Sequence, residues 1–170
     1  MSKILLEWVK RPTFFLKKLI NYSEILNGFL IGTGFVLIDL KQKGDNKNVF
    51  LEIFIDKKEN FGIDELALVN KNLWKFLEEN NMEKGISKII VSSPGAENPF
   101  KFFWQMKKHL GREVEVMTKN GESFSGKLEE IIDSEKEEFQ ILIKDKKNTK
   151  VLNFFFGDLT EVKIKLSFKK

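Results

Sequence analysis

The sequence contains no cysteine and only one histidine among its 170 residues. Without cysteine the chain cannot form disulfides, thiolate zinc sites, iron–sulfur clusters or a cysteine nucleophile. A single histidine also excludes metal sites built from several histidines and makes histidine-dependent catalysis an unfavoured interpretation. These absences argue against most classes of enzyme, and we predict a protein that needs no cofactor.

A long uninterrupted hydrophobic run is also absent. Charged residues break the basic stretch 1–20 before it reaches the roughly 20 apolar residues of a membrane span, and no small-residue cleavage site follows it. An amphipathic organelle presequence remains an alternative. We favour an N-terminal tail over residues 1–12 followed by a helix, and we expect a cytoplasmic protein that does not contact membranes.

The composition is that of a folded chain. Hydrophobic residues make up 42%, and the 29 basic residues exceed the 25 acidic residues by four. This is too apolar and too weakly charged for a disordered protein, and the length suits one or two small domains. Residues 1–110 hold 17 basic and 13 acidic residues, which leaves 12 of each in the remainder. We therefore expect any phosphate-facing surface on the first part and a protein partner on the second.

Residues 13–110 are predicted to form an α/β domain with the element order α-β-β-α-β-α. A helix capped by Thr13 is expected to end at the glycines that start with Gly28. Apolar patterning predicts strands over 35–40, 49–56 and 87–92, the first two joined as a hairpin. A second helix is expected from an N-cap at Asp64 to about residue 80, with one apolar stripe.

The end of this domain carries two turn signals. Pro94 and Gly95 occupy the second and third positions of a predicted type II turn. Asn98 and Pro99 then predict the N-cap and first residue of a helix that ends at His109. The boundary between domains is expected near residue 110, without a flexible linker.

Residues 111–170 show a different pattern, typical of a small SH3-like or Sm-like β-barrel. Asn120 and Gly121 predict a type I′ hairpin turn within this region. Five short strands are predicted, over residues 113–118, 123–132, 139–144, 150–156 and 161–168.

No catalytic constellation emerges from the motifs. Gly32 and Gly34 supply two glycines of a dinucleotide-binding loop, but Leu37 stands at the third position and a strand follows instead of preceding. Ser92 and Ser93 lie near no plausible base, so a serine hydrolase would first have to show turnover that is lost on Ser→Ala substitution. The acidic residues at 39, 52, 56 and 64 are interpreted as solvated turn or capping residues rather than as a metal site.

Three consecutive aromatic residues, Phe102, Phe103 and Trp104, stand among lysines in a pattern similar to a base-stacking surface. They cannot all face one side of a helix. We expect one or two of them in the core and one exposed at the seam between the domains.

Several motifs follow one another along the chain. Residues 89–95 read IIVSSPG, a Pro-apolar pair follows at 99–100, residues 111–116 read GREVEV, and residues 124–128 read FSGKL. In this order they resemble the RimP family of ribosome maturation factors, in which FSGKL matches the F-x-G-x-L strand, and the resemblance covers about residues 15–168. The motif residues are Ser92, Ser93, Pro94, Gly95 and Pro99 in the turn, and Gly111, Arg112, Phe124, Gly126 and Leu128 in the barrel. Asn98 departs from the pattern, because the family has an arginine there; a contact of that arginine with rRNA or with the seam between the domains is either absent here or supplied by Lys101.

The resemblance implies a non-enzymatic factor that binds the free small (30S) ribosomal subunit late in its assembly. It also implies a KH-like N-terminal domain and an SH3-like barrel that contacts a small-subunit ribosomal protein, acting as a monomer. The lysines expected to contact 16S rRNA, each contributing about one unit to the salt dependence, are Lys57, Lys58, Lys101, Lys107 and Lys108.

Two questions stay open from the sequence. The SSPG turn can act purely as a structural turn, which we favour, or its hydroxyls and free amides can bind phosphate beside a helix N-terminus. The alternative function is a small RNA-binding or scaffolding module with an Sm-like barrel that acts outside the ribosome, and such a module is expected to form rings.

Overall fold

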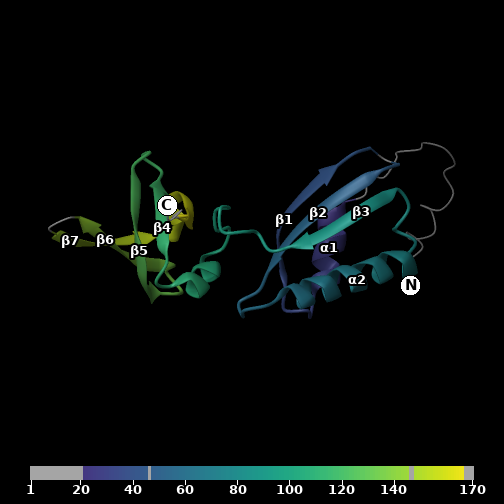
Figure 1. The fold of residues 1–170 in the computed structure, drawn as a ribbon, viewed down its shortest axis with the longest axis horizontal. Coiled ribbons are helices and arrows are strands. Elements are labelled where there is room, and N and C mark those ends of the chain that lie inside the picture. Colours follow the sequence, from purple (N-terminus) through teal and green to yellow (C-terminus); the bar gives the residue numbers. More distant parts are fainter. Residues whose placement is uncertain (1–20, 46, 146–147, 167–170) are drawn as a thin grey trace, which may run out of the picture.

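The computed structural model describes residues 21–166 except residue 46 and residues 146–147. The predicted tail 1–12 and the predicted helix start at Thr13 lie outside these residues. The fold is α+β with two separate sheets at opposite ends of an elongated molecule (Figure 1). The elements are α1 (Tyr22–Leu30), β1 (Val36–Lys43), β2 (Val49–Asp56), α2 (Ile63–Glu79), β3 (Ile86–Ser92), η3 (Phe103–His109), β4 (Glu113–Thr118), β5 (Ser123–Asp133), β6 (Glu138–Asp145), β7 (Asn148–Phe155), η4 (Phe156–Asp158) and β8 (Leu159–Ile164).

The first sheet has the strand order β1-β2-β3. β1 and β2 form the predicted antiparallel hairpin, and β3 lies parallel to β2. Helices α1 and α2 cover one face of this sheet (Figure 1), where alternate residues of β2 are buried against apolar side chains of both helices. The buried residues of β2 on this face are Val49, Leu51, Ile53 and Ile55. The opposite face of the sheet is not covered by either helix.

Helix α1 ends at Leu30, among the glycines predicted to end it, and Gly28 lies inside its last turn. The start of α2 differs from the prediction. In α2 the N-cap is Gly62 rather than Asp64, since the Glu65 carboxylate accepts a hydrogen bond from the Gly62 amide at 3.4 Å. Asp64 instead lies in the first turn, where its negative charge suits the helix dipole.

The segment that follows the SSPG turn is not the predicted helix 99–109. Only Phe103–His109 is helical, as a 3-10 helix. The Phe100 amide donates to the Val162 carbonyl of β8 at 2.8 Å, and the Gln105 side chain accepts from the amides of residues 101 and 102, so these groups are bonded outside a helix. This segment packs on the second core, through Ala96, Phe100, Phe103 and Met106, although the sequence prediction assigned it to the first domain.

The second sheet has the order β7-β6-β5-β4-β8, with every neighbouring pair antiparallel. All five strands predicted from the sequence are present, although β7 and β8 each begin two residues earlier than predicted and β8 already ends at Ile164. The prediction of a type I′ turn is wrong. Such a turn needs a positive φ at both central residues, but of Asn120 and Gly121 only Gly121 has one (+83°). The Gly121 amide donates to the Thr118 carbonyl and the Thr118 amide to the Glu122 carbonyl, which is a three-residue loop closed by a glycine bulge.

The glycine of the FSGKL motif, Gly126, lies where the neighbouring strand β6 leaves no room for a side chain. A Cβ atom there would lie 2.7 Å from the Leu142 carbonyl oxygen of the neighbouring strand β6. We expect Gly126→Ala to lower the free energy of unfolding by about 1–3 kcal/mol, because the strands must move apart. Chemical denaturation followed by circular dichroism measures this. Gly157→Ala is the matched control, since its Cβ would meet nothing within 4 Å; equal stability of both variants would contradict the prediction.

Candidate functional site

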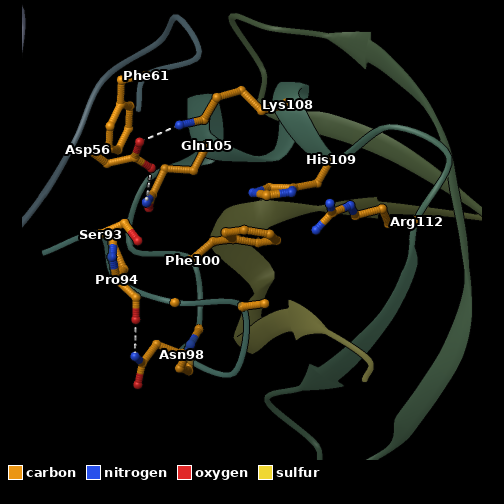
Figure 2. Close-up of a pocket in the computed structure, with 13 residues that line it drawn as sticks. Asp56, Phe61, Ser93, Pro94, Asn98, Phe100, Gln105, Lys108, His109 and Arg112 are labelled. Carbon is orange, nitrogen blue, oxygen red and sulfur yellow. Dashed lines mark hydrogen bonds and ion pairs between the residues drawn. The ribbon is translucent and has the colours of Figure 1, made fainter. Parts of the chain in front are cut away.

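A buried carboxylate joins the two sheets. Asp56, the last residue of β2, is 5% exposed, and its carboxylate accepts from the Gln105 side chain at 2.9 Å and pairs with Lys108 (Figure 2). Gln105 is 2% exposed, and its side-chain oxygen also accepts hydrogen bonds from the backbone amides of residues 101 and 102, just before η3. The Asp56 group therefore bonds the end of the first sheet directly to η3, which belongs to the second core.

Lys57 and Lys108 take part in this junction rather than reaching into solvent. The Lys108 ammonium also donates to the Lys57 carbonyl at 2.8 Å and lies near the rings of Phe61 and Trp104, and its side chain is 14% exposed. The Lys57 side chain, 16% exposed, pairs with Glu65. The hydrogen bond from Lys57 lowers the pKa of the Glu65 carboxyl below its ordinary value. Both lysines are thus engaged by an acidic partner.

Of the acidic residues predicted to be solvated, Asp56 is the one for which the prediction is wrong, because it is buried. Asp39 and Glu52 are partly exposed and pair with Lys101 and Lys43, at 3.3 and 2.9 Å. Asp56 differs because η3 folds over the end of β2 and covers it. The segment that covers it is 49 residues away in sequence, so no local pattern around Asp56 reports the contact.

A cavity of about 210 Å³ lies beside the junction (Figure 2). The SSPG turn forms one wall, and Phe100, His109 and Arg112 form another. An adjoining cavity of about 510 Å³ also reaches Ser92. The structure therefore brings the turn motif and Arg112 of the GREVEV motif to one place.

The SSPG turn is closed by Asn98, whose side chain donates to the Pro94 carbonyl (Figure 2). Gly95 has a φ of +79°, as the predicted turn requires. Pro99 follows on the surface. Asn98, which stands in place of the family arginine, thus has a structural role in this chain. No hydrogen bond joins Ser92 or Ser93 to His109 within the part of the chain that the structure describes.

His109 is the last residue of η3, and its ring stacks on Phe100 with centroids 5.2 Å apart. Burial, together with the nearby Arg112 and Lys108 charges, lowers the pKa of His109 below 6.5, while Asp56 opposes this shift. Its Nδ1 atom is buried without a hydrogen-bond partner among the described residues. The imidazole is therefore neutral at pH 7 and acts as a packed ring.

The lowered pKa predicts a pH dependence of stability. The unfolded chain takes up a proton on His109 near pH 6.5, whereas the folded chain takes it up only at lower pH, so stability falls as the pH drops below about 6.5. The lowered carboxyl pKa values of Glu65 and Asp133 act only at more acidic pH. We expect His109→Phe, which keeps the stacked ring, to flatten the melting temperature between pH 6.5 and 5. An unchanged slope would contradict this assignment.

Three exposed lysines and two aromatic rings form a second surface at the junction, called the seam patch: Lys58, Lys101, Phe102, Trp104 and Lys107. They line a cavity of about 460 Å³. Phe102 is 39% exposed and stacks on Trp104, with centroids 6.0 Å apart and planes 13° apart. Phe103 is buried in the second core, as expected for one member of the aromatic triplet.

The charges of the seam patch are only partly neutralised. Lys101 pairs with Asp39, but no carboxylate among the described residues pairs with Lys58 or Lys107. Flat rings beside free ammonium groups are the combination that binds nucleotide bases and phosphates together. Of the five lysines predicted from the sequence, the structure gathers three here, and the side chains of the other two, Lys57 and Lys108, pair with Glu65 and Asp56.

The barrel motif residues mostly build the second sheet. The Gly111 amide donates to the Leu128 carbonyl at 2.7 Å, and the Leu128 amide donates to the Arg112 carbonyl at 2.8 Å. Gly126 and Leu128 are buried, and the Phe124 ring packs on Phe154. Arg112 alone among them lines the junction cavity.

Within the described ranges, no group of three histidine, aspartate or glutamate side chains is arranged to hold a metal ion, and no helix has the length and apolar character of a membrane span. Comparison with known protein families gives a match over residues 25–97 to the RimP N-terminal domain. The matched residues run from α1 through the first sheet to the SSPG turn.

Proposed function

Through residues 25–97 this chain belongs to the RimP family of ribosome maturation factors, and from this premise we propose that it binds the free small ribosomal subunit and assists its late assembly without catalysing a reaction. The proposal includes a cytoplasmic monomer that contacts 16S rRNA and one small-subunit ribosomal protein. It further includes a KH-like fold for the first domain and an SH3-like barrel for the second.

The seam patch is the single observation that carries the RNA contact. Its exposed lysines can neutralise phosphates, and the stacked Phe102 and Trp104 rings offer an apolar face to a base. The buried Asp56 contacts hold the patch in place, because they fix η3 against the end of β2. A preorganised surface loses less conformational entropy on binding than a loose one.

The second sheet suits a protein partner. Its strand order, with the short η4 helix before the last strand, supports an SH3-like barrel. The edge strand β7 exposes Val151 and Phe155, at 47% and 45%. Exposed apolar residues beside unpaired strand groups favour contact with another polypeptide.

Sedimentation of the tagged protein with cell extract through a sucrose gradient tests this function. We expect the protein in the fraction of free small subunits and not with assembled ribosomes or polysomes. A protein that stays at the top of the gradient at low salt would overturn the proposal. Light scattering separates the alternative, because an Sm-like module outside the ribosome is expected to form rings, whereas we expect a monomer.

A further inference from the structure

The open face of the first sheet carries two phenylalanine rings beneath lysine ammonium groups. Helices α1 and α2 leave one face of this sheet uncovered (Figure 1). Phe50 and Phe54 lie four residues apart on the central strand β2, and because they alternate with the buried residues that face the helices, they lie on this open face. The Lys43 and Lys88 ammonium groups lie 5.6 and 5.1 Å from the Phe50 centroid, and Lys41 lies 5.1 Å from that of Phe54. We call these five residues the open-face cluster.

The pairing of the strands explains this arrangement. Lys43 on β1 and Lys88 on β3 are the register partners of Phe50, one on each side. Both phenylalanine side chains are partly exposed, whereas their neighbours on β2 that face the helices are buried. Two aromatic side chains on a solvent-facing sheet gain little from burial in the isolated protein. Their presence there points to a ligand with flat apolar faces.

The charge on this face favours an anionic ligand. Lys43 pairs with Glu52 at 2.9 Å, but neither Lys41 nor Lys88 has an acidic partner within the described ranges of the chain. Single-stranded RNA combines flat bases with phosphates, while a duplex hides its base faces. A base that displaces an ammonium group from a ring leaves that group free to bind the adjacent phosphate.

We propose that the open-face cluster binds an unpaired single-stranded segment of RNA, with bases stacked on Phe50 and Phe54 and phosphates held by Lys41, Lys43 and Lys88. The cluster adjoins the seam patch, because Asp39, the register partner of Phe54, pairs with Lys101. One RNA strand can therefore follow both surfaces. This inference rests on the proposed function and specifies the kind of rRNA element that the protein contacts.

Fluorescence anisotropy of the full chain with labelled oligouridine tests the proposal. We expect the double variant F50L/F54L to bind about 10–100-fold more weakly, since each stacked base contributes on the order of tenfold. The control L68A replaces an exposed apolar residue of α2, which lies on the covered side of the first sheet, and is expected to bind like the wild type. A fully paired RNA duplex is expected to bind more weakly than oligouridine.

The charge variants are read out by the salt dependence of oligouridine binding, which a loss of folded protein does not change. K41Q/K43Q/K88Q is expected to lower the salt slope of oligouridine binding by about two, and K71Q/K75Q/K136Q, on other surfaces, is expected to leave it unchanged. E52Q removes the carboxylate that pairs with Lys43 and is expected to tighten binding a few-fold. Wild-type affinity in F50L/F54L, or no tightening in E52Q, would overturn the proposal.

The outcomes separate this inference from the proposed function. If the wild type sediments with small subunits but its oligouridine binding does not depend on Phe50 and Phe54, only this inference fails. If oligouridine binding depends on them but no sedimentation with small subunits occurs, the ribosomal function fails and the single-strand site stands.

Discussion

Asp56→Ala is expected to lower the free energy of unfolding by about 3–5 kcal/mol. The substitution leaves the Lys108 ammonium, on a side chain that is 14% exposed, without its carboxylate, and it leaves the buried Gln105 amide without its acceptor. A buried charge that loses its partner retains its desolvation cost without the compensating attraction. Chemical denaturation followed by circular dichroism measures the change.

Two further variants identify the cause. Asp39→Ala removes a carboxylate from the more exposed pair with Lys101, where the expected loss is below about 1 kcal/mol. The double variant D56A/K108M removes both members of the buried pair and is expected to recover much of the stability lost in the single variant. If Asp56→Ala were no more harmful than Asp39→Ala, the buried junction would not hold the two sheets together.

Replacing the three lysines of the seam patch is expected to change RNA binding without changing stability. In K58Q/K101Q/K107Q, the slope of log affinity for small subunits against log salt is expected to fall by between about two and three, because each phosphate contact contributes about 0.7–0.9. The three side chains are exposed, and only Lys101 has an acidic partner within the described part of the chain. Filter binding at several salt concentrations measures the slope.

The comparison with Lys57 and Lys108 makes this prediction specific. Their replacement is expected to lower the free energy of unfolding, since each holds an acidic partner at the junction. The exposed lysines in K71Q/K75Q/K136Q match the charge change elsewhere and are expected to leave the slope unaltered. A slope that stays at the wild-type value in K58Q/K101Q/K107Q would remove the seam patch from the RNA interface.

Local patterns were sufficient to predict most strands and the α2 helix. β2 and β4 have the predicted bounds, because alternating apolar residues report a half-buried strand directly. The SSPG and GREVEV motifs were sufficient to indicate the family, and the match of residues 25–97 to its N-terminal domain includes the SSPG motif. Hence, the elements with a strong repeating pattern were the ones that the sequence specified well.

Long-range contacts decided the features that the sequence did not predict. The predicted helix at 99–109 is interrupted because β8, some sixty residues later, binds the Phe100 amide. The local sequence indicates a solvated Asp56, because its partners, Gln105 and Lys108, are supplied by a distant segment. The sequence does contain one indication of burial, because Asp56 directly continues a buried apolar strand. This indication can be interpreted only once the segment that covers Asp56 is known.

The most direct test of the central claim compares the wild type and K58Q/K101Q/K107Q in pelleting with purified small subunits, large subunits and assembled ribosomes. We predict that the wild type pellets with free small subunits alone and that the triple variant, while equally stable, binds them at least about tenfold more weakly. Equal pelleting of both proteins, or wild-type pelleting with every particle, would contradict the assignment of the seam patch as the small-subunit interface.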